Sequence, residues 1–365
     1  MSPATSPDAR LGRLRLVAQG LITRPFGRPA DAVAALGAMQ GQDLPGVLAS
    51  AALRTPSGVE AVLADVNAGR VVRGYPMRGT VFLLPAADAA WITELCARPS
   101  MRAASARSHQ LELDEAQISR ARDLALEALD AGPMPRAALF GHWEAHGLRP
   151  KGGRGYHLLF HLIAGGTLCY GPWNGADQDV VLASRWLPPG SSLESRFNGD
   201  RVAAVAELLR RYLTSHGPAT VRDFAWWTKL GLAEIRSALP LIEGDLESEA
   251  RGPEVSHRRP GLVEEAAELG RRASAPLLLP GFDEFVLGYQ DRLFALTASE
   301  HHRLVPGNNG VFKKSIVAGG LVRGIWSRGG RSGARRLETE EFTALSATAR
   351  AQLGARFEAF PFVAP

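Results

Sequence analysis

The chain has 365 residues, of which 45% are hydrophobic and 22% charged, so a disordered or fibrous protein is excluded and roughly two to four small domains can form. Its two cysteines, Cys96 and Cys169, are too few for a disulfide scaffold, a cysteine-rich zinc site or an iron–sulfur cluster. The net charge is +5 and only four basic residues are lysines; this arginine excess favours a polyanionic partner, although codon bias in a GC-rich genome produces the same composition.

The chain contains no apolar run long enough to span a membrane. Its first residues lack the charged and then apolar pattern of a signal peptide. We therefore expect a cytoplasmic protein without membrane contact.

The N-terminal third predicts three helices and a β-hairpin. Apolar spacing indicates helices over residues 14–21, 29–40 and 43–53, and a helical pattern continues over 58–63. Residues 71–84 then predict a strand, a turn and a second strand. Helices followed by a small hairpin are typical of a winged helix-turn-helix module.

A short repeat indicates two further modules of this kind. Residues 132–140 resemble residues 217–225, and an apolar helical pattern precedes each copy. In the second copy Thr220 and Asp223 have the spacing of a capping box, and residues 232–239 predict a short following helix. After the first copy, residues 156–164 predict a second helix, followed by a short strand.

After residue 270 the pattern changes to short β-like runs. These runs cover residues 275–280, 285–287, 314–317 and 321–326, with a hairpin signal at Gly319-Gly320 and a basic loop over 328–336. Several short strands separated by glycine turns predict a small β-barrel or half-barrel.

Two glutamines form the sharpest local feature. On the predicted helix 29–40, Val33, Leu36 and Gln40 share one face, so Gln40 is expected to face the core. Gly41 lets the helix end, so that Gln42 can turn toward the same space and both amides can converge on a small polar object such as a water molecule. Alternatively, both glutamines cap loop backbone groups. Asp43 has the position of a helix N-cap.

Six short motifs along the chain belong to one pattern. They are Gln40-x-Gln42, Met77-Arg-Gly-Thr80, Gly217-Pro218, Leu279-Pro-Gly-Phe-Asp-Glu-Phe285, Leu287-Gly-Tyr-Gln-Asp-Arg292 and Gly324-Ile-Trp326. With these motifs in the right order over about residues 10 to 360, the chain resembles the AlkZ-type winged-helix DNA glycosylases, bacterial enzymes that excise bulky alkylated bases and unhook interstrand crosslinks.

The resemblance implies an α+β fold with three tandem winged helix-turn-helix modules, closed by a small C-terminal β-barrel. The expected boundaries are 9–112, 113–198 and 199–270 for the modules and 271–365 for the barrel. The resemblance also implies that Gln40 and Gln42 are a catalytic pair. Two residues depart from the family pattern: Gly41 stands where the family has an apolar residue, and Phe82 stands where it often has histidine.

A glutamine pair suits the hydrolysis of an already weakened glycosidic bond. An N7-alkylated guanine is cationic and leaves without protonation, so the enzyme has to position a water and stabilise the positively charged sugar. We therefore predict a monofunctional glycosylase that needs no cofactor, with Asp43 as a candidate auxiliary base. No lysine lies near the motif, which disfavours a Schiff-base lyase.

The partner expected from these predictions is double-stranded DNA carrying alkylated or crosslinked purines, bound by a monomer. Protection of a producer against its own genotoxic metabolite is one setting that the resemblance implies. Basic residues of the wing and of two later loops are candidates for phosphate contacts. They are Arg73, Arg78, Lys151, Arg154, Lys313 and Lys314.

Other features give weaker predictions. His142 and His146, and likewise His157 and His161, have the i, i+4 spacing of metal ligands, but Glu144 is out of step with the zinc-protease order, and packing explains the second pair. Two alternatives to a glycosylase remain open: a winged-helix regulator that binds DNA without chemistry, and a non-catalytic damage sensor.

Overall fold

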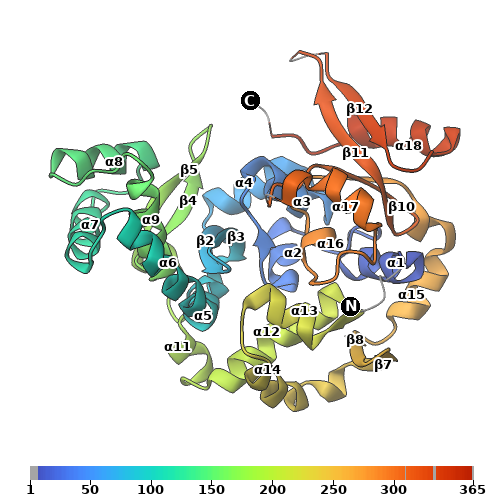
Figure 1. The fold of residues 1–365 in the computed structure, drawn as a ribbon, viewed down its shortest axis with the longest axis horizontal. Helices are drawn as coiled ribbons and strands as arrows, with labels where there is room; N and C mark the ends of the chain where they lie inside the picture. Colours follow the sequence, from blue (N-terminus) through green and yellow to red (C-terminus); the bar gives the residue numbers. More distant parts are fainter. Residues whose placement is uncertain (1–6, 309, 332–333, 364–365) are drawn as a thin grey trace.

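The computed structural model describes residues 7–308, 310–331 and 334–363. Helices and strands are mixed along the chain, and the described strands form three antiparallel sheets. The protein is thus of the α+β class, as the sequence predicts (Figure 1). Within the described residues no helix is both long and apolar enough to cross a membrane.

The N-terminal elements follow the predicted order. They are α1 (Ala9–Ala18), α2 (Pro29–Leu36), β1 (Met39–Gln40), α3 (Leu44–Leu53), α4 (Val59–Asn67), β2 (Val71–Met77) and β3 (Thr80–Pro85). The predicted hairpin is confirmed, because β2 and β3 pair across a turn at Arg78 and Gly79. The predicted helix over residues 29–40 is wrong at its end, because Gly37 adopts a φ of 80° and stops the helix before Met39.

A helical lobe follows and shares a sheet with the N-terminal region. Its elements are α5 (Ala86–Cys96), α6 (Arg98–Gln110), α7 (Glu115–Ala128), α8 (Arg136–Ala145), α9 (Arg154–Ala164), β4 (Leu168–Trp173) and β5 (Gln178–Leu182). The five strands run in the order β1-β3-β2-β4-β5, and β2 meets β4 where Arg73 pairs with Tyr170. Helix α9 packs against β2 and β4, and α7 and α8 lie further out, at the edge of the molecule (Figure 1).

The third set of elements contains the long helix that underlies the core. It comprises α10 (Ala183–Trp186), α11 (Leu193–Phe197), α12 (Arg201–His216), β6 (Ala219–Thr220), α13 (Val221–Thr228), α14 (Leu232–Ala238), β7 (Glu247–Arg251), β8 (Glu254–Arg258) and α15 (Leu262–Leu269). Short 3-10 turns cover Leu239–Leu241, Glu243–Asp245 and Gly270–Ser274. The predicted capping box is confirmed, since Thr220 and Asp223 each bond the other's backbone N–H.

The C-terminal elements form an open sheet. They are β9 (Leu277–Leu279), α16 (Glu284–Leu287), α17 (Ala298–Leu304), the 3-10 turn Pro306–Asn308, β10 (Ser315–Ala318), β11 (Leu321–Gly329), β12 (Arg336–Glu341) and α18 (Ala347–Glu358). Among the described residues the strand order is β12-β11-β10-β9 with no closure, so the predicted β-barrel is wrong. Residues 285–287, predicted as β-like, belong to α16, because the Asp283 side chain accepts the Phe285 N–H and caps a helix there.

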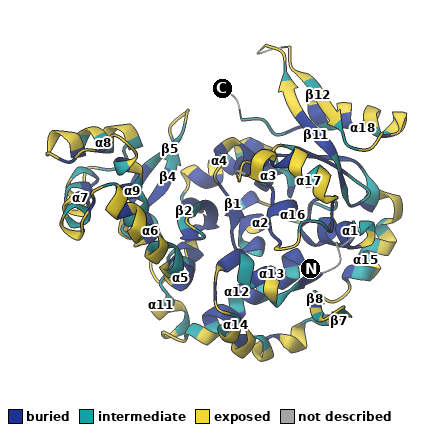
Figure 2. Ribbon diagram, viewed as in Figure 1, coloured by how far each residue is buried: buried dark blue, intermediate teal, exposed yellow. Residues whose placement is uncertain are grey.

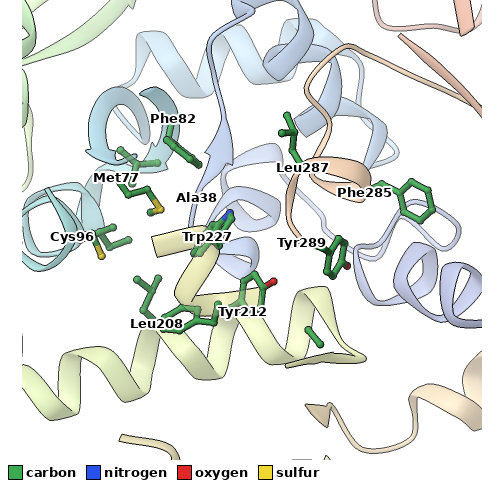
Figure 3. Packing of buried hydrophobic residues seen from close by; sticks show 14 of the residues in the cluster. Ala38, Met77, Phe82, Cys96, Leu208, Tyr212, Trp227, Phe285, Leu287 and Tyr289 are labelled. Atoms are coloured by element: carbon green, nitrogen blue, oxygen red, sulfur yellow. The ribbon is translucent and has the colours of Figure 1, made fainter. Parts of the chain in front are cut away.

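The core of the body lies where α12, α13 and the segment around α16 meet the first sheet. Trp227 and Tyr212 are fully buried there, and Phe82 of β3 and Tyr289 border them (Figure 3). The Trp227 ring meets Phe82 edge-on at 6.3 Å and lies 5.2 Å from Tyr212. Buried residues concentrate in this body, whereas the outer helices α7 and α8 expose much of their surface (Figure 2). The strand that bears Gln40 is therefore backed by the closely packed core.

Candidate functional site

Gln40 lies on an edge strand held from two sides. In β1 it pairs with Phe82 of β3, and the N–H of the next residue, Gly41, donates to the Val81 carbonyl at 2.8 Å. The backbone N–H of Gln40 donates to Oε1 of Glu284 at 2.6 Å. The position of Gln40 is thus fixed by one strand and one buried carboxylate, although the sequence predicts it on a helix.

The two amides converge. Nε2 of Gln40 donates to Oε1 of Gln42 at 3.0 Å and to Oγ1 of Thr80 at 3.3 Å, while Oε1 of Gln40 accepts the Gly41 N–H at 3.2 Å. Gln40 is only 5% exposed, whereas Gln42 is exposed. These bonds leave the Nε2 protons of Gln42 and a lone pair on each amide oxygen directed outside the pair. The buried glutamine therefore orients the exposed one.

Glu284 supports the pair and is a residue that the sequence reasoning missed. It is 1% exposed, and its Oε2 accepts the indole N–H of Trp227 at 3.2 Å and lies 3.5 Å from Nε2 of His216. A carboxylate inside the apolar run from Phe282 to Leu287 is the signal that could have found it, because a buried charge needs fixed partners.

The preceding carboxylate, Asp283, anchors the same segment to α3. It forms two hydrogen bonds with Arg54, at 2.9 and 3.1 Å, and accepts the Ser50 hydroxyl at 2.5 Å. Burial raises the pKa of Asp283, but Arg54 and the hydrogen bonds outweigh burial, and the pKa is below its usual value. Nη2 of Arg54 also donates to Oε1 of Gln19 at 2.8 Å. Asp283, from the motif Leu279–Phe285, therefore forms a structural ion pair with Arg54.

Asp43 occupies the N-cap position of α3 but makes no side-chain capping bond. Its carboxylate instead lies over Gly46, where a Cβ would come within 2.6 Å of Oδ2. Lys314 is close enough to interact with the Asp43 carboxylate. Burial and Arg328 lower the pKa of Lys314 and Asp43 raises it, and the net effect is a lowered pKa. The predicted N-cap position of Asp43 is therefore confirmed, but its carboxylate makes no capping hydrogen bond.

The wing arginines Arg73 and Arg78 have different surroundings. Arg73 is buried, donates to Oε1 of Gln178 at 3.1 Å and faces the Tyr170 ring, so it joins two halves of the sheet. Arg78 lies at the turn with a φ of 58° and stacks over Phe82 and Trp226, at 5.1 and 4.6 Å from the ring centres. Its Nε and Nη2 are buried without a hydrogen-bond partner in the described part of the chain.

The remaining basic candidates lie on two separate surfaces. Lys151 is exposed and pairs with Glu144 at 2.9 Å, whereas Arg154 donates to the carbonyls of Leu111 and Glu112 and so ties a loop to α9. Lys313 is exposed, and Lys314 is half-buried with its ammonium 5.0 Å from the Trp326 ring. Of these four, Arg154 has a clear internal role.

The histidine pairs do not form a metal centre. No cluster of three potential metal ligands occurs within the described residues. Nε2 of His157 and Nε2 of His161 both approach the Ser108 hydroxyl, at 2.8 and 3.2 Å, which makes a small polar network between α6 and α9. Cys96 and Cys169 are free and buried, and burial raises the pKa of both thiols.

The two departures from the family pattern meet in space. A Cβ at Gly41 would lie 3.1 Å from the Leu83 nitrogen and 3.2 Å from the Phe82 carbonyl carbon. Phe82 itself is fully buried against Trp227. A side chain at position 41 would therefore require the backbone of β3 to shift by a few tenths of an ångström.

Comparisons with known proteins identify the family and agree with the overall fold. A family described as AlkZ-like DNA glycosylase matches residues 33–361. An interstrand DNA cross-link repair glycosylase from Streptomyces sahachiroi is 26% identical over 278 residues, which are 73% of each chain. The solved structure of Streptomyces sahachiroi DNA glycosylase AlkZ superposes with a TM-score of 0.74 at 20% identity, over 98% of this chain and 99% of that one. The chain belongs to the AlkZ-like DNA glycosylase family, hydrolases that act on N-glycosyl bonds.

Proposed function

We propose that the protein is a monofunctional glycosylase that hydrolyses the N-glycosidic bond of alkylated purines in double-stranded DNA, chiefly N7-alkylguanine. The observation that carries this proposal is the contact between the Gln40 and Gln42 amides at an exposed edge of a rigid core. Two neutral amides position a water and contribute dipoles, but they are weak bases. Such a site suits a base that is already a good leaving group.

In this proposal Gln42 holds the attacking water and Gln40 holds Gln42. The water oxygen bonds to C1′, the glycosidic electron pair leaves with the cationic base, and the water proton passes to solvent. The amide oxygens face the positive charge that develops on the sugar. Asp43 is placed beside Gln42 in the chain, and we propose it as an auxiliary acceptor for the water proton.

We further propose that residues 9–112, 113–198 and 199–270 are three tandem winged helix-turn-helix modules, with residues 271–365 as a C-terminal β domain. Arg78, Lys151, Lys313 and Lys314 are proposed as phosphate contacts. Arg73 and Arg154, which make internal bonds, would contribute mainly by fixing the DNA-binding surface.

The lesion class is suggested by a relative. The Streptomyces sahachiroi protein is named as an interstrand cross-link repair glycosylase. We propose that this chain also unhooks crosslinked purines. A crosslinked base cannot leave the stack freely, so the site would act on it without complete base flipping.

Base release from defined duplexes tests the proposal. The protein is incubated with a duplex containing N7-methylguanine and with an interstrand-crosslinked duplex, and abasic sites are measured. Abasic sites in both would support the full proposal, and sites in the first alone would exclude crosslinks. No release from either, with tight binding to a defined undamaged sequence, would instead indicate a regulator, and selective binding of damaged DNA without release a sensor.

Gln42→Ala separates catalysis from binding. Because Gln42 is exposed, we expect about a hundredfold slower excision with nearly unchanged duplex affinity and thermal stability. Gln352→Ala, a change of an exposed glutamine on α18, is the matched control and should leave all three unchanged. Equal loss of excision and binding in Gln42→Ala would show a structural role for this residue.

A further inference from the structure

Three cations surround one indole ring beside the glutamine pair. The Arg78 guanidinium lies 4.6 Å from the Trp226 ring centre, the Arg292 guanidinium 4.8 Å and the Lys229 ammonium 5.6 Å. The three residues come from the β2–β3 turn, the segment after α16 and the end of α13. Elements far apart in the sequence thus bring like charges to one aromatic side chain.

The cluster of Arg78, Lys229 and Arg292 has no paired carboxylate among the described residues. None of its three cations takes part in an ion pair among residues 7–308, 310–331 and 334–363. Glu284 attracts Arg78 from a distance, but its oxygens already accept from Gln40 and Trp227. Three buried nitrogens also lack acceptors in the described structure. They are Nε and Nη2 of Arg78 and Nε of Arg292.

The charges in the cluster repel one another and lower one another's pKa values. Burial and the neighbouring Arg78 lower the pKa of Arg292 to about 10. Burial and both arginines lower the pKa of Lys229, and burial and Arg292 lower that of His301 on α17. An anion placed among them would relieve this repulsion and fill the empty hydrogen bonds. Guanidinium groups that are already held on an aromatic face lose little conformational entropy when they bind an anion.

The cluster adjoins the glutamine pair. Arg78 is two residues from Thr80, whose hydroxyl is 3.3 Å from Nε2 of Gln40, and it stacks on Phe82, the strand partner of Gln40. We propose that Arg78, Lys229 and Arg292, arranged around Trp226, bind a DNA phosphodiester that flanks the target nucleotide. This inference rests on the proposed action on DNA and assigns the backbone contact that would hold the sugar over Gln42.

A binding assay on an uncleavable duplex tests the site independently of base release. The probe is a duplex with a tetrahydrofuran abasic analogue, and affinity is measured over a range of salt concentrations. For Arg292→Gln we expect about tenfold weaker binding near 0.1 M salt and a salt slope smaller by about 1, the value for one lost phosphate contact. Arg222→Gln on α13, whose arginine already pairs with Glu254, should change neither.

A scan with neutral methylphosphonates identifies the phosphate. Replacing the correct phosphodiester should weaken binding of the wild type and of Arg222→Gln by about tenfold, but should not weaken Arg292→Gln further. Because repulsion is relieved, the melting temperature of Arg292→Gln should be unchanged or higher. Equal losses in all three proteins at every position, or an unchanged salt slope with a lower melting temperature, would overturn the proposal.

Lys229→Gln is the second variant, because Lys229 is exposed and its loss leaves the core intact. It should lower the salt slope in the same way, and an unchanged slope would count against the site. Base release is measured separately. If the protein releases no base but the variants give the expected salt slopes, the phosphate site is supported and the proposed reaction is contradicted. Base release with unchanged salt slopes would support the reaction and contradict the phosphate site.

Discussion

Two polar networks, one buried and one half-buried, lie in different parts of the molecule and are built from different kinds of hydrogen bond. Behind the glutamine pair, the carboxyl groups of Asp283 and Glu284 accept hydrogen bonds from fixed donors. Between α6 and α9, Ser108, His157 and His161 form a network of neutral groups. Charge-assisted bonds are stronger and hold a fixed geometry, whereas neutral networks are sensitive to protonation. The site is backed by the network that changes least with conditions.

The largest expected effect tests the charged network. Asp283→Ala leaves Arg54, which is 0% exposed, without its counterion, and we expect a loss of about 3–5 kcal/mol in the free energy of unfolding. Urea unfolding measures it. The double change Arg54→Met with Asp283→Leu should recover most of the loss, since it removes both charges. A loss below about 1 kcal/mol for Asp283→Ala would mean that the pair is not needed to hold the segment.

Glu284→Gln tests whether this network also serves the site. A carboxamide offers one acceptor where two are required and turns an N–H toward a donor, so we expect a loss of about 1–3 kcal/mol in stability. The displaced Gln40 should also slow excision by about tenfold at temperatures where the variant is fully folded. Glu268→Gln, at an exposed position on α15, is the control. Normal excision by the folded variant would limit Glu284 to a structural role.

The smallest effect concerns the neutral network. Burial, His161 and Arg107 lower the pKa of His157, and burial lowers that of His161, both from the ordinary value of 6.5. The unfolded chain therefore binds protons first, so the contribution of these histidines to stability is complete above pH 6.5 and is lost as the pH falls from there toward their lowered pKa values.

Melting temperatures between about pH 8 and about pH 5 measure this dependence. His157→Gln should flatten the decrease, whereas His109→Gln, at an exposed position on α6, should not. An identical decrease in all three proteins would assign the pH dependence to other groups.

The sequence predicted the elements better than their ends. The β2–β3 hairpin and the Thr220–Asp223 capping box follow from local patterns, and both are confirmed. Gln40 was expected on a helix because its apolar spacing continues past Leu36, but Gly37 ends the helix and only strand pairing with β3 decides the rest. Local periodicity cannot reveal such a pairing, since it depends on a hairpin more than 30 residues further along the chain.

The contact between the two glutamines was predictable, but its geometry and its support were not. The sequence predicted that Gln40 and Gln42 converge, although from a helix ending at Gly41 and not from the strand that holds Gln40, and the carboxylate of Glu284 comes from a segment more than 200 residues away. The open form of the C-terminal sheet could not be predicted either, because it also depends on contacts between distant segments. Strand runs and glycine turns give the strands, but closure depends on the outer pairing of β9 and β12, which no local pattern specifies.

The tight approach at Gly41 has a consequence for swapping residues between relatives. A methyl group there would lie 3.1 Å from the Leu83 nitrogen and 3.2 Å from the Phe82 carbonyl carbon, so the backbone of β3 would have to shift by a few tenths of an ångström. We expect a larger residue at position 41 to displace β3 at Phe82, the strand partner of Gln40. Positions 41 and 82 should thus be exchanged as a pair, and a single exchange should change the contact between Gln40 and Gln42.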